Sequence, residues 1–149
     1  MSDKEKLLRE ADEAFEALKQ AVAGLDENQM RRRWFGSWGV REILIHVSGW
    51  HRETIPALAR VGGAESPYAA GTYDDADLWN ARFVDRAAGD KLTDILQELD
   101  DSHRDFVAAA AALPDTHFAP GGPARELFEG SGAPHYREHA TQILEWRSA

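Results

Sequence analysis

Two histidines stand four positions apart near the end of this 149-residue chain, in the stretch HYREHATQILEW at residues 135–146. On an α-helix, side chains at this spacing lie on one face with their Cβ atoms about 6 Å apart. The imidazoles of His135 and His139 could therefore bind one metal ion, at about 2.0–2.1 Å from each nitrogen. The alternative is that both rings pack in the core, where each would need a hydrogen-bond partner.

Two ligands seldom hold a metal ion, so a third ligand is expected elsewhere in the chain. His46, in the apolar segment ILIHVSGW, is the strongest candidate, because it shares a helix face with Ile43 and Trp50. The sequence thus predicts a metal site made of His46, His135 and His139. Three imidazoles leave coordination positions open, where the ion would act as a Lewis acid on water or on a thiol. The chain contains no cysteine, so such a thiol would come from a small molecule.

Four further side chains are candidates for the same site. Glu53, two turns after His46, could orient a ligand histidine or accept a proton as a catalytic group. Asn80 could contact the substrate, Trp50 could form a wall of the substrate pocket, and His103 could reach that pocket from the interior. The alternatives are a solvated glutamate, an asparagine bonded to nearby backbone, and plain packing of the tryptophan. The two histidines that remain are predicted to face solvent: His51 and His117.

The composition limits the range of partners and compartments. A formal net charge of −9 would repel a polyphosphate, so nucleic acid is not an expected partner. No apolar run approaches the roughly 20 residues that span a bilayer, and the charged start MSDKEKLLREADEAF does not resemble a signal peptide. Without cysteines, nothing indicates an oxidising compartment. We therefore expect a cytoplasmic protein whose 149 residues form a single domain, residues 1–149, that acts on a small molecule.

The spacing of apolar residues predicts helices and no strands. A capping box at Ser2 begins the first helix, which ends near Gly24, and a second helix runs from residue 39 or 40 to residue 61. Pro56 is expected to kink or locally break that second helix. A short helix at residues 76–88, a long one at 92–113 and a last one from Pro134 complete an all-α, four-helix bundle with one extra short helix. Three connections without regular structure are expected at residues 26–39, 62–75 and 115–133.

Three stretches, taken in order along the chain, resemble a known superfamily. They are GSWGVREILIHVSGWHRE, LWNARF and HYREHATQILEW. Together they resemble the DinB/YfiT-like superfamily of four-helix bundles, and most closely its ClbS/DfsB branch. The resemblance implies a divalent metal, zinc or nickel, on three histidines, which by position are His46, His135 and His139. It also implies that the protein could form a homodimer.

The resemblance leaves three classes of function open. Relatives include transferases and isomerases that use a low-molecular-weight thiol, which implies a metal-dependent enzyme for small electrophiles that acts in detoxification or self-resistance by S-transfer or hydrolysis. The ClbS branch resembles a self-resistance protein that opens a cyclopropane by hydrolysis, without an assumed metal, or that sequesters a small molecule. The third class is a bundle whose metal is structural. Whether the second and last helices run parallel or antiparallel is also left open by the sequence.

Overall fold

The computed structural model describes residues 1–61 and 71–149, and these residues form helices joined by turns. No strand occurs in the described part of the chain, where the only β pairing is an isolated bridge between Phe35 and Trp38. The elements are α1 (Asp3–Val22), α2 (Glu27–Arg31), α3 (Val40–Ala59), α4 (Ala76–Arg86), α5 (Leu92–Ala111), the 3-10 helix η1 (Asp115–Phe118), α6 (Arg125–Ser131) and α7 (Ala133–Ser148). The all-α prediction is confirmed.

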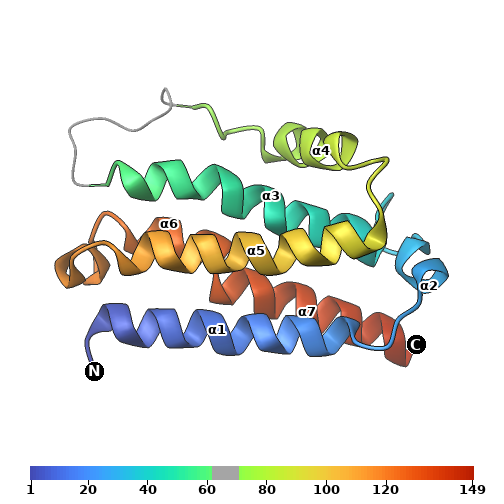
Figure 1. The fold of residues 1–149 in the computed structure, drawn as a ribbon, viewed down its shortest axis with the longest axis horizontal. Coiled ribbons are helices and arrows are strands. Elements are labelled where there is room, and N and C mark those ends of the chain that lie inside the picture. The colour runs from blue at the N-terminus through green and yellow to red at the C-terminus, as the bar shows by residue number, and fades with distance from the viewer. Residues whose placement is uncertain (62–70) are drawn as a thin grey trace.

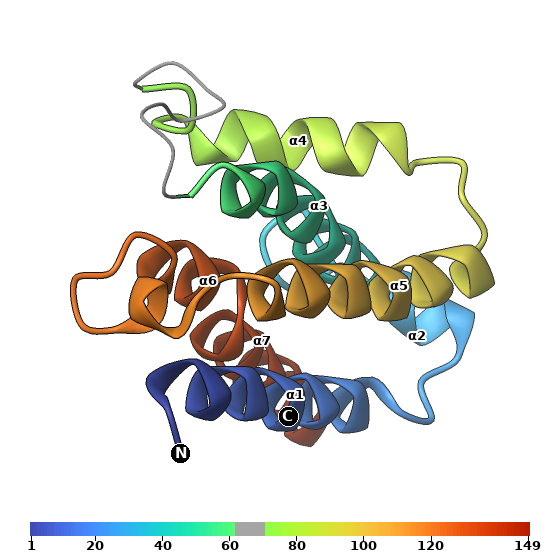
Figure 2. The same cartoon turned by 60° about the vertical axis from the view of Figure 1, so that its left-hand side comes forward.

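Four long helices form the bundle, as Figures 1 and 2 show: α1, α3, α5 and α7. Helix α1 packs mainly against α7, and α3 packs mainly against α5, while the shorter α4 lies along the outer side of α3. Figure 1 shows that α3 and α7 run in opposite directions. Helix α7 begins partway along the bundle, and this offset brings its first two turns to the level of the second turn of α3.

The helix ends follow signals that are present in the sequence. The Ser2 hydroxyl accepts a hydrogen bond from the Glu5 backbone N–H at 3.1 Å, so the predicted capping box of α1 is confirmed. The backbone N–H of Gly39 donates to the Glu42 carboxylate at 2.8 Å and begins α3. Helix α3 is not broken at Pro56 but continues to Ala59, because residues on its core side, including Leu58, remain buried there.

Two of the three connections that were predicted to lack regular structure contain helices. Helix α2 begins at a capping box in which Asp26 accepts from the Gln29 backbone and Gln29 accepts from the Asp26 backbone, at 2.7 and 2.9 Å. The later connection forms η1 and α6, because Phe128 is buried against Phe106 of α5 and Phe118 is buried against Phe128. Of the connection expected at residues 62–75, residues 62–70 lie outside the described part of the chain.

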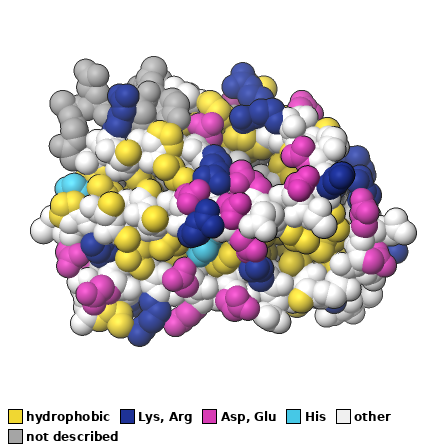
Figure 3. Space-filling model, in the orientation of Figure 1, with side chains coloured by type: hydrophobic (Ala, Val, Ile, Leu, Met, Phe, Trp, Pro, Cys, Tyr) yellow, Lys and Arg dark blue, Asp and Glu magenta, His cyan; other side chains and the backbone are white. Residues whose placement is uncertain are grey.

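Two hydrophobic clusters form the interior of the bundle. The larger one surrounds Leu18, Ile43, Tyr136 and Ile143, and the smaller one joins the start of α1 to the end of α5. None of the helices in the described ranges combines the length and the apolar character needed to cross a bilayer. Figure 3 shows acidic and basic side chains interspersed on the face over α1 and α5, so the net negative charge is not gathered into one patch there.

Candidate metal site

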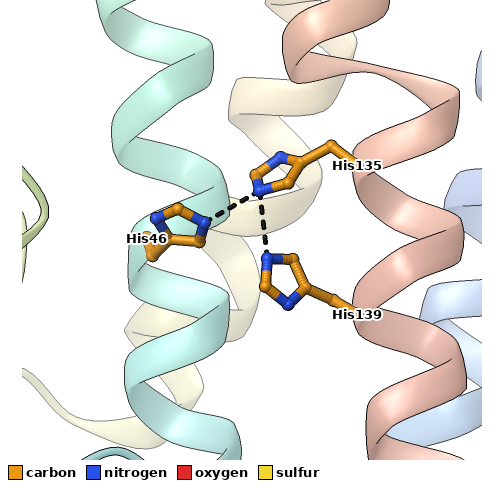
Figure 4. A group of neighbouring side chains, drawn as sticks. All are labelled: His46, His135 and His139. Atoms are coloured by element: carbon orange, nitrogen blue, oxygen red, sulfur yellow. Dashed lines mark hydrogen bonds between the residues drawn. The ribbon is translucent and has the colours of Figure 1, made fainter. Parts of the chain in front are cut away.

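The three histidines predicted as metal ligands lie together between α3 and α7 (Figure 4). The Nε2 atom of His135 is 2.8 Å from Nε2 of His46 and 3.0 Å from Nε2 of His139. The three ligand nitrogens all lie within 4.8 Å of one another. His46 and His139 are buried, and His135 is half-buried. Three Nε2 atoms therefore converge on one point between the helices.

The other nitrogen of His46 shows which tautomer the ring adopts. Nδ1 of His46 lies 2.8 Å from Oδ1 of Asn80, and the same oxygen lies 2.7 Å from Nε1 of Trp50. An indole N–H can only donate, so the atom that it contacts is the amide oxygen and not the nitrogen. That oxygen must then also accept from His46, whose Nδ1 carries the hydrogen. The Nε2 atom of His46 consequently presents a lone pair to the other two histidines.

His139 is oriented in a similar way within its own helix. Its Nδ1 lies 2.9 Å from Oε1 of Gln142, an oxygen that accepts the Nδ1 hydrogen and leaves a lone pair on Nε2. His135 differs, because its Nδ1 is buried and has no hydrogen-bond partner among the described residues. Histidines that bind metals characteristically donate their second N–H to a nearby oxygen, and two of these three rings do so.

The cluster has too few hydrogens to satisfy its own close contacts. His135 can donate at most one hydrogen from Nε2, while two lone pairs face it, so at least one N···N contact stays unsatisfied. Protonation does not relieve this, because burial and the neighbouring rings lower the pKa of His135 to about 3. Burial also lowers the pKa of His46 to about 4, and it lowers the pKa of His139. Three neutral imidazoles with converging lone pairs fit a divalent metal ion.

The short turn between α2 and α3 covers the triad on one side. The ring centroid of Trp38 lies 5.4 Å from that of His46, and the Phe35 ring meets His139 edge-on at 6.5 Å. Paired backbone hydrogen bonds of 2.9 Å between Phe35 and Trp38 close this turn, and Gly36 adopts a positive φ of 61° within it. These two aromatic rings reduce the access of water to the triad from this side.

A cavity of about 340 Å³ opens onto the triad from another side. Its lining combines aromatic, acidic and hydroxyl side chains with two of the three histidines: His46, Trp50, Glu53, Thr54, Tyr73, Glu126, Ser131 and His135 among others. Glu53 is half-buried and accepts a 2.9 Å hydrogen bond from the Tyr73 hydroxyl. Glu53 makes no hydrogen bond to a triad histidine in the described structure, so the orienting role predicted for it falls to Asn80.

The position of Asn80 depends on the close packing of α4 against α3. A Cβ atom on Gly49 would lie only 2.4 Å from Cγ of Phe83, so the absence of a side chain at Gly49 lets the two helices approach. Arg41 of α3 donates to the carbonyls of Ala87 and Ala88 just after the end of α4, at 2.9 and 3.2 Å. Neither contact was foreseen from the sequence, although a glycine within a strongly apolar helix signals a close approach.

The prediction that His51 faces solvent is wrong. His51 is fully buried, its Nδ1 lies 2.8 Å from the Ser102 hydroxyl, and its Nε2 contacts the Tyr136 hydroxyl. It lies on the side of α3 that packs against α5, and sequence periodicity did not identify that second buried face. His117, also predicted to face solvent, is half-buried.

His103 is buried, as expected, but it does not line the cavity described above. Its Nδ1 lies 2.7 Å from the Tyr136 hydroxyl, its Nε2 lies 2.9 Å from the Asp12 carboxylate, and its ring stacks on Phe15. Because the carboxylate accepts, Nε2 carries the hydrogen and Nδ1 accepts from Tyr136. His103 therefore belongs to a buried polar network that joins α1, α3, α5 and α7 (the His51–Tyr136–His103 network), and not to the lining of the cavity beside the triad.

The chain matches a known protein family over most of its length. A family model described as the mycothiol maleylpyruvate isomerase N-terminal domain matches residues 8–136. The matched span includes His46, Asn80 and His135 and ends shortly before His139. No curated protein matches the chain.

Several solved structures share the fold over nearly their whole length. DfsB, described as a sibling lethal factor precursor, superimposes with a TM-score of 0.84 at 16% identity and covers 99% of this chain and 96% of its own. A protein from Streptococcus pneumoniae gives a TM-score of 0.79 at 15% identity, over 99% and 91% of the two chains. An uncharacterised protein from Escherichia coli UTI89 gives 0.74 at 15% identity, over 97% and 92%. At these identities the likeness shows the fold alone.

Proposed function

Because the chain belongs to the mycothiol maleylpyruvate isomerase N-terminal domain family, within the DinB/YfiT-like superfamily, we propose that it binds a divalent metal ion and acts as a metal-dependent enzyme on small electrophiles. The ligands are His46, His135 and His139. One observation carries the proposal. Three Nε2 atoms converge, and two of them have lone pairs oriented by Asn80 and Gln142.

The donor set is compatible with zinc or nickel, the two metals that the family resemblance implies. Neutral imidazole suits zinc and nickel, and three such ligands leave positions open for a substrate or for water. When bound, such an ion supplies Lewis acidity, which lowers the pKa of a coordinated water or thiol. Because the chain has no cysteine, S-transfer requires a low-molecular-weight thiol as co-substrate, whereas hydrolysis requires only water.

The residues of the chain prepare the site for this chemistry. Asn80 and Gln142 hold two rings in the tautomer that can donate a lone pair, so little reorganisation is needed when a metal binds. The Glu53 carboxylate lines the same cavity as His46 and His135 and is held by Tyr73, so it can contact a ligand that is bound in that cavity. Phe35 and Trp38 reduce the access of water to the triad on the side of the turn between α2 and α3.

Elemental analysis of protein purified without an affinity tag tests the proposal. We expect about one zinc or nickel ion per chain in the wild type and in His117→Ala, and little or none in His46→Ala or His135→Ala. Far-UV circular dichroism checks that these variants are folded. A folded wild type that takes up neither metal after reconstitution would contradict the metal site and would favour a metal-independent hydrolase or a binding protein.

A screen for activity then separates the two reactions. Zinc-loaded protein is given a small electrophile, with and without a low-molecular-weight thiol, and loss of the electrophile is followed by mass spectrometry. Consumption that depends on the thiol supports S-transfer, and consumption in its absence supports hydrolysis. Consumption that continues in the metal-free His135→Ala variant would rule out a catalytic role for the metal.

A further inference from the structure

The lining of the cavity beside the triad combines two aromatic rings with an acidic group. The rings of Trp50 and Tyr73 meet edge-to-face, with centroids 5.5 Å apart, and both side chains line the cavity. Glu53 lies in the same lining, where its Oε2 accepts from the Tyr73 hydroxyl at 2.9 Å. Its second oxygen, Oε1, makes no hydrogen bond within the described ranges and is available to a ligand. Aromatic faces combined with a carboxylate form the arrangement by which proteins recognise ammonium groups.

The charge of the lining favours the same class of ligand. A second carboxylate, that of Glu126 at the start of α6, also lines the cavity and is exposed to solvent. No lysine or arginine belongs to the lining contributed by the described residues. An anionic ligand would therefore meet two like charges without a side-chain counter-charge, whereas a cation is attracted by both.

We propose that this cavity binds a substrate or co-substrate that carries a protonated or quaternary amine, with Glu53, Trp50 and Tyr73 holding the cationic group. Glu126 attracts the same charge at the outer part of the cavity. His46 and His135 form another part of the lining, so a ligand held in this way presents its uncharged end to the triad. The assignment of that uncharged end as the reacting end rests on the proposed function, but the binding of the amine does not.

Three probes of similar shape and different charge test the proposal: benzylammonium, benzyl alcohol and benzoate. Their binding to the metal-free and the zinc-loaded protein is measured by ¹H–¹⁵N NMR titration. The indole N–H of Trp50 and the backbone amides of Thr54 and Ser131 report on the cavity. We expect benzylammonium to bind about tenfold more tightly than benzyl alcohol in the metal-free protein, since a hydrogen bond to a charged group is stronger than one between neutral groups.

Matched variants locate the source of that preference. Glu53→Gln keeps an acceptor for Tyr73 but removes the charge, so the preference for benzylammonium should fall from about tenfold to about twofold, with a smaller fall for Glu126→Gln. Glu145→Gln changes the net charge equally at an exposed position on α7 outside the cavity, and it should leave the preference unchanged.

The outcomes distinguish this inference from the proposed function. Any of three results would overturn the amine site. These are equal affinity for benzylammonium and benzyl alcohol, NMR shift changes confined to residues away from the cavity, and a loss of preference in Glu145→Gln as large as that in Glu53→Gln. Failure of zinc to bind would overturn the proposed function, while the metal-free titrations would still decide whether the cavity selects a cation.

Discussion

Asn80 of α4 and His46 of α3 are joined by a 2.8 Å hydrogen bond from the ring Nδ1 to the amide oxygen. Trp50 donates to the same oxygen, and it thereby orients the amide. The orientation of His46 consequently depends on α4, a helix that contributes no histidine to the triad. Asn80 thus orients the His46 ring, and it is not among the residues that line the cavity beside the triad.

Replacing Asn80 should weaken metal binding without unfolding the bundle. In Asn80→Ala the Nδ1–H of His46 loses its acceptor, and we expect the zinc affinity to fall by about 10–100-fold, the usual effect of losing a partner that orients a ligand. Asn80→Asp keeps an oxygen at this position and should retain the affinity. Competition with a chromogenic chelator measures both values, and the exposed Asn28→Ala is the matched control. Wild-type affinity in Asn80→Ala would show that the hydrogen bond does not support the site.

The contact between Gly49 and Phe83 should couple the packing of α4 to the triad. In Gly49→Ala the added methyl group would overlap the Phe83 ring, which should cost about 1–3 kcal/mol of unfolding free energy. Displacement of α4 should also move Asn80 and lower the zinc affinity. Urea unfolding and the chelator competition measure the two effects. Gly89→Ala, where a Cβ would meet no atom within 4 Å, should change neither value by much. A stable Gly49→Ala protein with unchanged affinity would refute the coupling.

The Tyr136 hydroxyl should contribute to stability by serving two buried histidines. In Tyr136→Phe both His51 and His103 lose this partner, and we expect the free energy of unfolding to fall by about 1–3 kcal/mol for each nitrogen left unsatisfied. Urea denaturation of the metal-free protein provides the measurement. Tyr73→Phe, at a half-buried position, should have a smaller effect. Equal stabilities of Tyr136→Phe and the wild type would mean that water replaces the hydroxyl.

Stability should fall as the pH is lowered, because two histidines outside the triad are buried in their neutral form. Burial lowers the pKa of His51, which is fully buried. It also lowers the pKa of His103, which is less deeply buried. Below a pH of about 6.5 the unfolded chain therefore binds more protons than the native one, and the free energy of unfolding decreases with decreasing pH. Urea unfolding of metal-free protein between pH 7.5 and 5 follows this loss. His51→Gln removes one such group and should give a shallower slope, and an identical slope would exclude His51 as a source.

Part of the candidate site could be predicted from local sequence patterns alone. The spacing of His135 and His139 on one helix, and the place of His46 on an apolar face, indicated the three rings that the structure brings together. The roles of Glu53 and His103 were not predictable in this way, since each depends on which neighbour lies across a helix interface. Glu53 bonds Tyr73, and His103 bonds Tyr136 and Asp12.

The sequence by itself determined the long helices and one apolar face of each, because capping boxes and apolar periodicity act within one or two turns of a helix. Tertiary structure alone decided that α3 and α7 run antiparallel, that Asn80 reaches His46, and that His51 is buried. These outcomes follow from packing between segments 30 or more residues apart, as in the 34-residue separation of His46 and Asn80. No local sequence pattern specifies how closely two helices approach each other. Here the absence of a side chain at Gly49 permits the close approach of α3 and α4.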